Sequence, residues 1–406
     1  MATSESVIDN STRAHPVSAP LLVITELFLP TKGGTAVWFD EVYRRLGGKE
    51  IHVVTASVAG SAAHDSDHPN SIHRVRLVRH WWLRPESLAM YAKLFIRSIW
   101  LCLRHRVQVI HAGRVLPEGL VGLAAARITR VPLVVYAHGE EITGWRNPGK
   151  FRAKVYVYRR AERIIANSEF TRAELIKLGV HPNRVSLIRP GVDISRFRPG
   201  LAGGDLRRDL AMPADRKLVL SVGRLSRRKG FDQTIRAVAR LRAEGLDVAY
   251  ALIGIGPDRE YLEHVARECG MREHVHFLGE IAPGELPKWY CAADVFTMPN
   301  RKIGGDTEGF GMVFVEAAAC GKPVVAGKDG GTADAVVDGV TGLRVDGESL
   351  NELVAALRKL LADAELCARM GNQGLERVRA ELSWERVAQM TRSLCIVRSA
   401  VDSACE

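Results

Sequence analysis

The sequence predicts an α/β protein in which two doubly wound, Rossmann-like domains face each other across a cleft. Its 406 residues, 47% of them hydrophobic, are too many for one ordinary core. Short runs of apolar, often β-branched residues alternate with helical patterns, which is typical of parallel sheets buried on both faces. One stretch rich in Gly, Pro and charge interrupts this alternation near the middle, so we expect two domains joined by a linker.

The first domain is expected over residues 21–195. Residues 1–20 are polar and contain no apolar segment, so they predict a disordered leader and not a signal peptide. Helical patterns separate the apolar runs that follow, and strands connected in this way run parallel to one another. The expected strands are 21–25, 51–55, 107–113, 132–139, 163–168 and 185–191.

The second domain is expected over residues 217–380, after a linker at 196–216. Ligands of open parallel sheets bind at the carboxyl ends of the strands, so we expect the functional site in the cleft between the domains. The last residues, 381–406, contain a helical segment for which Ser383 is a suitable N-cap. The expected strands of this domain are 217–225, 248–256, 275–280, 294–299 and 323–327.

Net charge and cysteine content restrict the class of binding partner and the cellular compartment that we expect. A formal net charge of +11 favours an acidic partner, which could be nucleic acid, a phosphorylated small molecule or an anionic membrane. The seven cysteines are odd in number and scattered, which argues for reduced thiols and against a disulfide framework or a zinc site. With no export signal, these features predict a cytoplasmic protein.

Two turns at strand ends are candidates for binding an anion. Gly33 and Gly34 precede an amphipathic helix, so backbone N–H groups at the helix start could face a phosphate; a tight turn without a ligand explains them equally well. In VGRLSRRKG, Arg224 follows a strand and Lys229 lies in the next turn. Together they could neutralise a diphosphate, and a solvated basic loop is the alternative.

The stretch EGFGMVFVEAAAC places Glu308 just before a helix and Glu316 inside it. Glu308 can accept hydrogen bonds from sugar hydroxyls. The N–H groups of Phe310, Gly311 and Met312 point from the helix start toward a phosphate or the same sugar. The neighbours of Glu316 are apolar, so a buried Glu316 needs a polar partner such as a ribose. Alternatively, Glu308 only complements the helix dipole and Glu316 is exposed.

These motifs resemble the retaining glycosyltransferases of family 4, which have the GT-B fold. The resemblance covers roughly residues 20–390 and rests on EGFGMVFVE, VGRLSRRKG, ANSEFT, IRPGVDISRFRP and GGTADAVVDGVTGLRVD. It implies transfer of a hexose from a nucleotide diphosphate sugar, GDP-mannose or a UDP-hexose, to a glycan or lipid-linked acceptor, without a metal or another cofactor. It also implies that segment 381–406 crosses back to the first domain, with Trp384 as an apolar anchor.

The resemblance implies roles for residues of the second domain. Arg224 and Lys229 would hold the diphosphate, and Glu308 would hold the donor sugar. Glu316 would hold the ribose, and Gly254 would lie near the base.

In the first domain, the resemblance places Gly33 and Gly34 on the phosphate and acceptor side, and His138 of YAHGEE against the reacting sugar. Such a transfer passes through an oxocarbenium-like state, so positive groups must stabilise the departing diphosphate. The resemblance further implies a reaction on one face of the sugar, in which the leaving phosphate takes the acceptor's proton.

A stretch rich in Trp and Arg, residues 79–106, is relevant to whether the acceptor is linked to a lipid. Its uncharged runs are far shorter than the ~20 residues needed to span a bilayer. It could lie on an anionic membrane surface, which would make the protein peripheral on the inner face of the membrane and the acceptor lipid-linked. A core helix with a basic surface is an equal alternative.

Two other functions and one other site remain open. A nucleotide-sugar epimerase or hydrolase could share the fold, and a basic nucleic-acid-binding protein could explain the charge. The latter has no use for a buried Glu316, so we expect no nucleic-acid partner. In HDSDH, Asp65 and Asp67 are expected in a solvated loop and not in a metal site.

Overall fold

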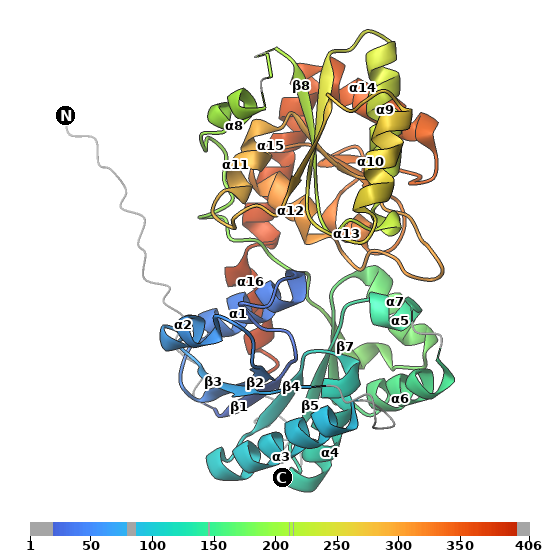
Figure 1. Ribbon diagram of the computed structural model, residues 1–406. Helices are drawn as coiled ribbons and strands as arrows, with labels where there is room; N and C mark the ends of the chain where they lie inside the picture. Colours follow the sequence, from blue (N-terminus) through green and yellow to red (C-terminus); the bar gives the residue numbers. More distant parts are fainter. Residues whose placement is uncertain (1–18, 79–86, 145–146, 211, 214, 396–406) are drawn as a thin grey trace, which may run out of the picture.

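The computed structural model describes residues 19–78, 87–144, 147–210, 212–213 and 215–395. It contains two α/β domains, each built on one parallel sheet, and they lie one above the other in Figure 1. The predicted fold class is therefore confirmed. Most of the predicted leader lies outside the described residues, as does the end of segment 381–406.

The first domain has a seven-stranded sheet in the order β3-β2-β1-β4-β5-β6-β7. Its strands are β1 Leu21–Ile24, β2 Ile51–Ala56, β3 Ser71–Val75, β4 Val109–Ala112, β5 Leu133–Ala137, β6 Arg163–Ala166 and β7 Val185–Leu187. Its helices are α1 Gly34–Leu46, α2 Ser61–Ser66, α3 Leu88–His105, α4 Leu120–Thr129, α5 Glu140–Gly144, α6 Pro148–Tyr158 and α7 Glu169–Lys177.

The apolar residues of β1 show why this sheet is buried on both faces. Leu22 and Ile24 pack into a core with α3 and α4, whereas Leu21 and Val23 pack into a second core with α1. Successive side chains of a strand point to opposite faces, so a continuous apolar run supplies both cores.

The second domain has a six-stranded sheet in the order β10-β9-β8-β11-β12-β13. Its strands are β8 Lys217–Val222, β9 Val248–Ile253, β10 Val275–Gly279, β11 Val295–Met298, β12 Val324–Gly327 and β13 Gly342–Val345. The helices that follow β7 are α8 Gly204–Asp209, α9 Phe231–Ala243, α10 Arg259–Glu268, α11 Leu286–Ala292, α12 Met312–Ala319, α13 Thr332–Ala335, α14 Leu350–Ala362, α15 Ala364–Glu381 and α16 Trp384–Arg392. The stretch expected as a linker thus includes α8.

The chain passes between the domains twice, and the two crossings lie side by side. The Val192 N–H donates to the Leu382 carbonyl at 2.8 Å, and the Trp384 N–H donates to the Val192 carbonyl at 3.3 Å. The Ser383 side chain caps α16 by accepting from the Arg386 N–H at 3.3 Å. Helix α16 then packs beside α1 of the first domain, where Trp384 joins the buried core.

Two further properties of the described residues concern membrane-spanning helices and disulfide bonds. No helix among them is long and apolar enough to cross a membrane. Their six cysteines are free thiols.

Candidate functional site

A cavity of about 400 Å³ lies between the two domains, at the carboxyl ends of the strands. It brings together most of the residues that the sequence analysis selected. Those lining it are Gly33, Gly34 and His138 from the first domain, and Arg224, Lys229, Glu308, Phe310, Gly311 and Met312 from the second.

Glu308 lies at the centre of an ion-pair network in this cavity. Its Oε2 atom accepts from Lys229 Nζ at 2.5 Å and from Arg228 Nη1 at 2.9 Å. Burial alone would raise the pKa of Glu308, but the two cations lower it to about 2. Arg228 also pairs with Asp306 at 3.1 Å. Two cations thus converge on one carboxylate, and the same two can face a diphosphate.

Arg224 offers a third positive charge to the cavity. It follows β8, its side chain is exposed, and the described residues include no ion-pair partner for it. It therefore differs from Lys229 and Arg228, whose charges are already paired with a carboxylate.

The start of α12 also borders the cavity. Gly311 precedes the helix with φ 90°, a left-handed conformation that favours glycine. The first N–H groups of a helix have no partner within it and carry partial positive charge. The backbone at Met312 and Val313 therefore adds to the positive potential around Glu308.

His138 lies on the opposite wall, just after β5. Its Nε2 atom lies 2.8 Å from the Gly113 carbonyl oxygen, which can only accept, so the ring proton is on Nε2 and Nδ1 carries a lone pair. Trp38 and Phe39 pack edge-on against the ring. The orientation of the ring is thereby fixed.

The two domains touch directly beside the cavity. A Cβ atom on Gly309 would collide with the His138 carbonyl oxygen, so only glycine permits this approach. Asp334 of the second domain pairs with Arg189 at 2.6 Å and accepts from the Glu169 N–H at 2.9 Å. These contacts hold the cleft in the arrangement described.

Two predicted site residues do not line this cavity. Gly254 has φ 142°, and a Cβ there would collide with the Gly223 carbonyl, so close packing of two turns explains this glycine. Glu316 accepts a hydrogen bond from the Tyr290 hydroxyl at 2.7 Å. Burial raises the pKa of Glu316, while Tyr290 and Arg196 oppose that rise. Their roles at the base and at the ribose stay predictions.

The HDSDH stretch is not the solvated loop that was expected. Asp65 lies in α2 and forms a two-pronged pair with Arg74, at 2.9 Å to Nε and 2.7 Å to Nη2. Asp67 is the C-cap residue of the same helix. The Arg74 pair joins α2 to strand β3.

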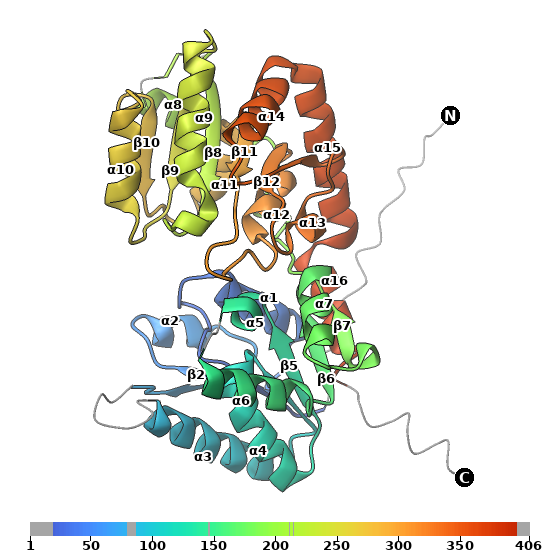
Figure 2. The same cartoon turned by 90° about the vertical axis from the view of Figure 1, so that its right-hand side faces the viewer.

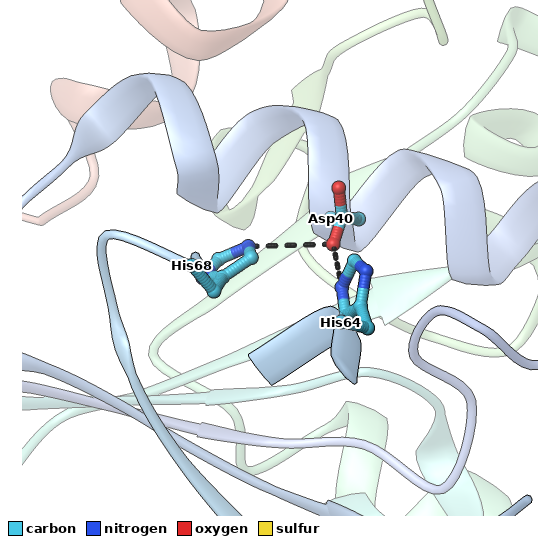
Figure 3. Close-up of side chains that lie close together, drawn as sticks. All are labelled: Asp40, His64 and His68. Carbon is cyan, nitrogen blue, oxygen red and sulfur yellow. Dashed lines mark hydrogen bonds and ion pairs between the residues drawn. The ribbon is translucent and has the colours of Figure 1, made fainter. Parts of the chain in front are cut away.

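The histidines of the same stretch converge on Asp40 of α1, as Figure 3 shows. His64 Nε2 and His68 Nε2 lie 2.7 Å and 3.3 Å from Asp40 Oδ1, a grouping that resembles a metal site in outline. However, His68 Nδ1 accepts the N–H of Asn70 at 3.2 Å.

That hydrogen bond places the ring proton of His68 on Nε2, the atom that faces Asp40, whereas a metal ligand needs a lone pair there. Burial would raise the pKa of Asp40, but His68, Arg44 and His64 lower it. The cluster therefore suits a polar contact between α1 and the α2 segment better than it suits a metal ion.

The cavity residues that the sequence reasoning missed include Thr35, Glu140, Asn167 and Arg228. Arg228 is the residue before Lys229 in a run of three basic residues, and the pattern does not say which of them faces inward. Glu140 follows His138 in YAHGEE, so its position just after a strand was a usable signal.

Two family models match the chain, one in each domain. "Glycosyltransferase Family 4" matches residues 32–196, and "Glycosyl transferases group 1" matches residues 204–377. The chain is 32% identical over 377 residues to a Mycobacterium tuberculosis protein named GDP-mannose-dependent alpha-(1-6)-phosphatidylinositol monomannoside mannosyltransferase, covering 91% of this chain and 96% of that protein. It is 32% identical over 341 residues to the D-inositol 3-phosphate glycosyltransferase of Kribbella flavida, covering 79% and 77%.

Solved structures share the fold. Anabaena Alr3699/HepE, crystallised in complex with UDP and glucose, superposes with a TM-score of 0.79 at 23% identity over 92% of this chain and 98% of its own. WaaG, a glycosyltransferase involved in lipopolysaccharide biosynthesis, gives a TM-score of 0.70 at 17% identity, covering 93% and 100%.

Proposed function

The chain belongs to the family 4 glycosyltransferases, and we propose that it transfers mannose from GDP-mannose to a lipid-linked acceptor with retention of configuration. Its family makes it a glycosyltransferase that acts with a nucleotide sugar. The observation that carries the proposal is the cavity in which Arg224, Arg228 and Lys229 surround Glu308 at the start of α12.

In this proposal, the diphosphate of the donor binds where the three cations converge. It takes over part of the charge that Lys229 and Arg228 now share with Glu308. Glu308 can then accept hydrogen bonds from hydroxyls of the donor sugar. A carboxylate with a pKa of about 2 is a weak base, which suits it to binding hydroxyls and not to taking the acceptor's proton.

Retention follows if both bonds change on the same face of the sugar. The C–O bond to the diphosphate breaks, the acceptor oxygen bonds to the same carbon, and the acceptor proton passes to the departing phosphate. Arg224, Arg228 and Lys229 stabilise the charge that develops on the diphosphate. His138 Nδ1 accepts a hydrogen bond from a hydroxyl group of the reacting sugar.

GDP-mannose is preferred over a UDP-hexose as donor because of the relatives. The mycobacterial protein that matches 91% of this chain is named as GDP-mannose-dependent. That protein also acts, by its name, on a phosphatidylinositol monomannoside, which supports a glycolipid acceptor here. In the bound state we place Glu316 at the ribose and Gly254 near the base.

Helix α3 supports docking on an anionic membrane. Its outward face combines Ile96, Trp100 and Leu103, exposed by 67%, 48% and 67%, with the exposed cations Lys93 and Arg104. Apolar and basic side chains on one helix face suit the interface of an anionic bilayer. Trp81 and Trp82, which belong to the same predicted surface, lie outside the described residues.

Figures 1 and 2 place α3 on the side of the first domain that faces away from the second. Docking through this helix would therefore leave the cleft uncovered.

The donor assignment is tested by thermal unfolding with GDP, UDP, ADP and their sugar conjugates, because a ligand of the native state raises its melting temperature. We expect GDP and GDP-mannose to give the largest shifts. Larger shifts with UDP-sugars would overturn the choice of donor. Release of free mannose from GDP-mannose at the same rate with and without an acceptor would favour a hydrolase instead.

A further inference from the structure

Two of the free thiols, those of Cys291 and Cys320, lie together where helices α11 and α12 pack. Cys291 is part of α11, and Cys320 is the C-cap residue of α12. The Sγ atom of Cys320 lies 3.8 Å from the carbonyl oxygen of Pro287, which is four residues before Cys291 in α11. A side chain in a helix covers the turn that precedes it, so Cys291 covers this same turn. The two thiols are accordingly hydrogen-bonded to each other.

The two thiols differ in exposure and in acidity. Cys291 is partly exposed, whereas Cys320 is buried. The hydrogen bond with Cys320 lowers the pKa of the Cys291 thiol to about 6; the Leu201 N–H and Lys322 add to this effect, while burial opposes it. The same hydrogen bond and burial raise the pKa of Cys320. The neutral Cys291 thiol can donate to the Arg198 carbonyl oxygen at 3.3 Å, and once it ionises it accepts from Cys320.

This pair has the features of a thiol that reacts with oxidants. A thiolate reacts faster than a thiol, and an accessible thiol of low pKa beside a second thiol is readily oxidised to a disulfide. Cys291 is the accessible thiol of low pKa. Cys320 is the second thiol, within reach of the first.

The same two helices are joined by a hydrogen bond that involves a residue of the proposed donor site. Tyr290, the neighbour of Cys291, donates its hydroxyl to Glu316, which lies about one turn before Cys320. A disulfide requires its sulfur atoms to approach more closely than two hydrogen-bonded thiols do. Its formation would therefore shift α11 against α12 beside Glu316, the residue that we place at the ribose.

We propose that Cys291 and Cys320 form a disulfide when the protein meets a peroxide, and that this disulfide weakens binding of the donor nucleotide. The disulfide itself is independent of the proposed function. Its effect on the donor rests on that function, because it acts through Glu316.

The oxidation proceeds in two steps. The Cys291 thiolate attacks one peroxide oxygen and the O–O bond breaks, which leaves a sulfenic acid on Cys291 and a hydroxide that takes up a proton to form water. The Cys320 sulfur then attacks the Cys291 sulfur, the S–O bond breaks, and a second water leaves with the Cys320 proton. Two electrons pass from the sulfur atoms to the peroxide, and a dithiol reductant reverses the change.

The first test treats the full chain with hydrogen peroxide, blocks the remaining thiols and maps disulfides by mass spectrometry of peptides. We expect a linkage between Cys291 and Cys320 that a dithiol reductant removes. Cys269→Ser, a change at another partly exposed cysteine, is the matched control and should retain the linkage. Absence of the linkage from oxidised wild-type protein would overturn the inference.

Two variants separate the roles of the thiols. In Cys320→Ala, the sulfenic acid on Cys291 has no thiol to attack it and should be trapped by dimedone. In Cys291→Ser, the buried Cys320 should stay unmodified under the same conditions. Sulfenic acid on Cys320 and none on Cys291 would contradict the assigned roles.

The second test measures the Kd for GDP of reduced and oxidised wild-type protein. We expect oxidation to raise this Kd roughly tenfold or more, the loss expected for a hydrogen bond to a charged group, and reduction to restore it. Cys291→Ser should have the same Kd before and after peroxide, which excludes an effect of oxidation elsewhere in the chain. An unchanged Kd in wild-type protein that carries the linkage would overturn the effect on the donor.

Failure of this inference and failure of the proposed function give different results. If reduced protein does not bind GDP, the proposed function fails, and the peptide mapping still decides whether the disulfide forms. If reduced protein binds GDP and peroxide produces no linkage, only the inference about the two cysteines fails.

Discussion

At the scale of single residues, charge around Glu308 organises the cleft. The sequence pattern placed Glu308 and Lys229 in one site, and the structure pairs them at 2.5 Å. It could not distinguish Arg228 from its basic neighbours, because the direction of its side chain is set by Asp306 and Glu308, which lie far away in the sequence. Nor could it show that Gly254 meets the Gly223 carbonyl, since that contact joins turns about 30 residues apart in the sequence.

The low pKa of Glu308 predicts how stability depends on pH. Its pKa falls from 4.5 to about 2, so its ionised form stabilises the fold above pH 4.5, and this contribution is lost as pH falls toward 2. The full contribution is on the order of 3 kcal/mol. Urea unfolding of wild type and Glu308→Gln should differ more at pH 6 than at pH 3. A constant difference would contradict this account.

The three cations of the cavity predict a kinetic pattern. Replacing Arg224, Arg228 or Lys229 with Ala should each cost about 2 kcal/mol of transition-state stabilisation, a loss of roughly 30-fold in kcat/KM. Arg272→Ala, a change at an exposed arginine away from the cavity, serves as the control. Circular dichroism should show an unchanged fold. Normal kcat/KM in all three variants would contradict the proposal that these cations bind the diphosphate of the donor.

At the scale of elements, continuous apolar runs predicted the interior strands and the edge strands β7 and β10, whereas β3 and β13 were missed. Both lie at the edge of a sheet, and β3 is half-buried and carries polar residues such as His73 and Arg74. An edge strand has one neighbour and needs less apolar surface, so its pattern is weak. Helix α2 was missed because it has six residues and none of them is buried, so its sequence carries no apolar periodicity.

The contact between the loop before α12 and the end of β5 predicts that a larger residue at position 309 would keep the two domains apart. In Gly309→Ala, the added Cβ would collide with the His138 carbonyl oxygen, so the domains could not approach as closely and kcat should fall by roughly tenfold or more. Stability of each domain should be unchanged. Gly284→Ala is the control, because a Cβ there meets no atom within 4 Å. Equal kcat in the two variants would show that this approach is not needed.

At the scale of the whole molecule, both domains line the cavity around Glu308, and α16 returns the chain to the first domain (Figure 2). The two-domain architecture was predictable because each half repeats the alternation of strand and helix. The ion pair of Asp334 with Arg189 was not, since it depends on how the folded domains approach each other.

Membrane docking is a prediction at this scale. Lys93→Gln combined with Arg104→Gln should weaken binding to anionic vesicles by roughly 1 kcal/mol for each lost charge, and high salt should weaken wild-type binding. Arg97 is left unchanged because it packs over Trp100, with its Cζ 4.5 Å from the ring centre. Arg272→Gln is the charge-matched control. Wild-type protein that stays in the supernatant with anionic vesicles at low salt would exclude docking through α3.

The proposed activity is retaining transfer of mannose from GDP-mannose in the cleft around Glu308. The most direct measurement is the anomeric configuration of the first-formed product, read by NMR, when the protein is supplied with GDP-α-mannose and phosphatidylinositol monomannoside in vesicles. We expect an α-linked mannose whose formation depends on Lys229 and Arg228. A β-linked product, or release of free mannose without transfer, would contradict it.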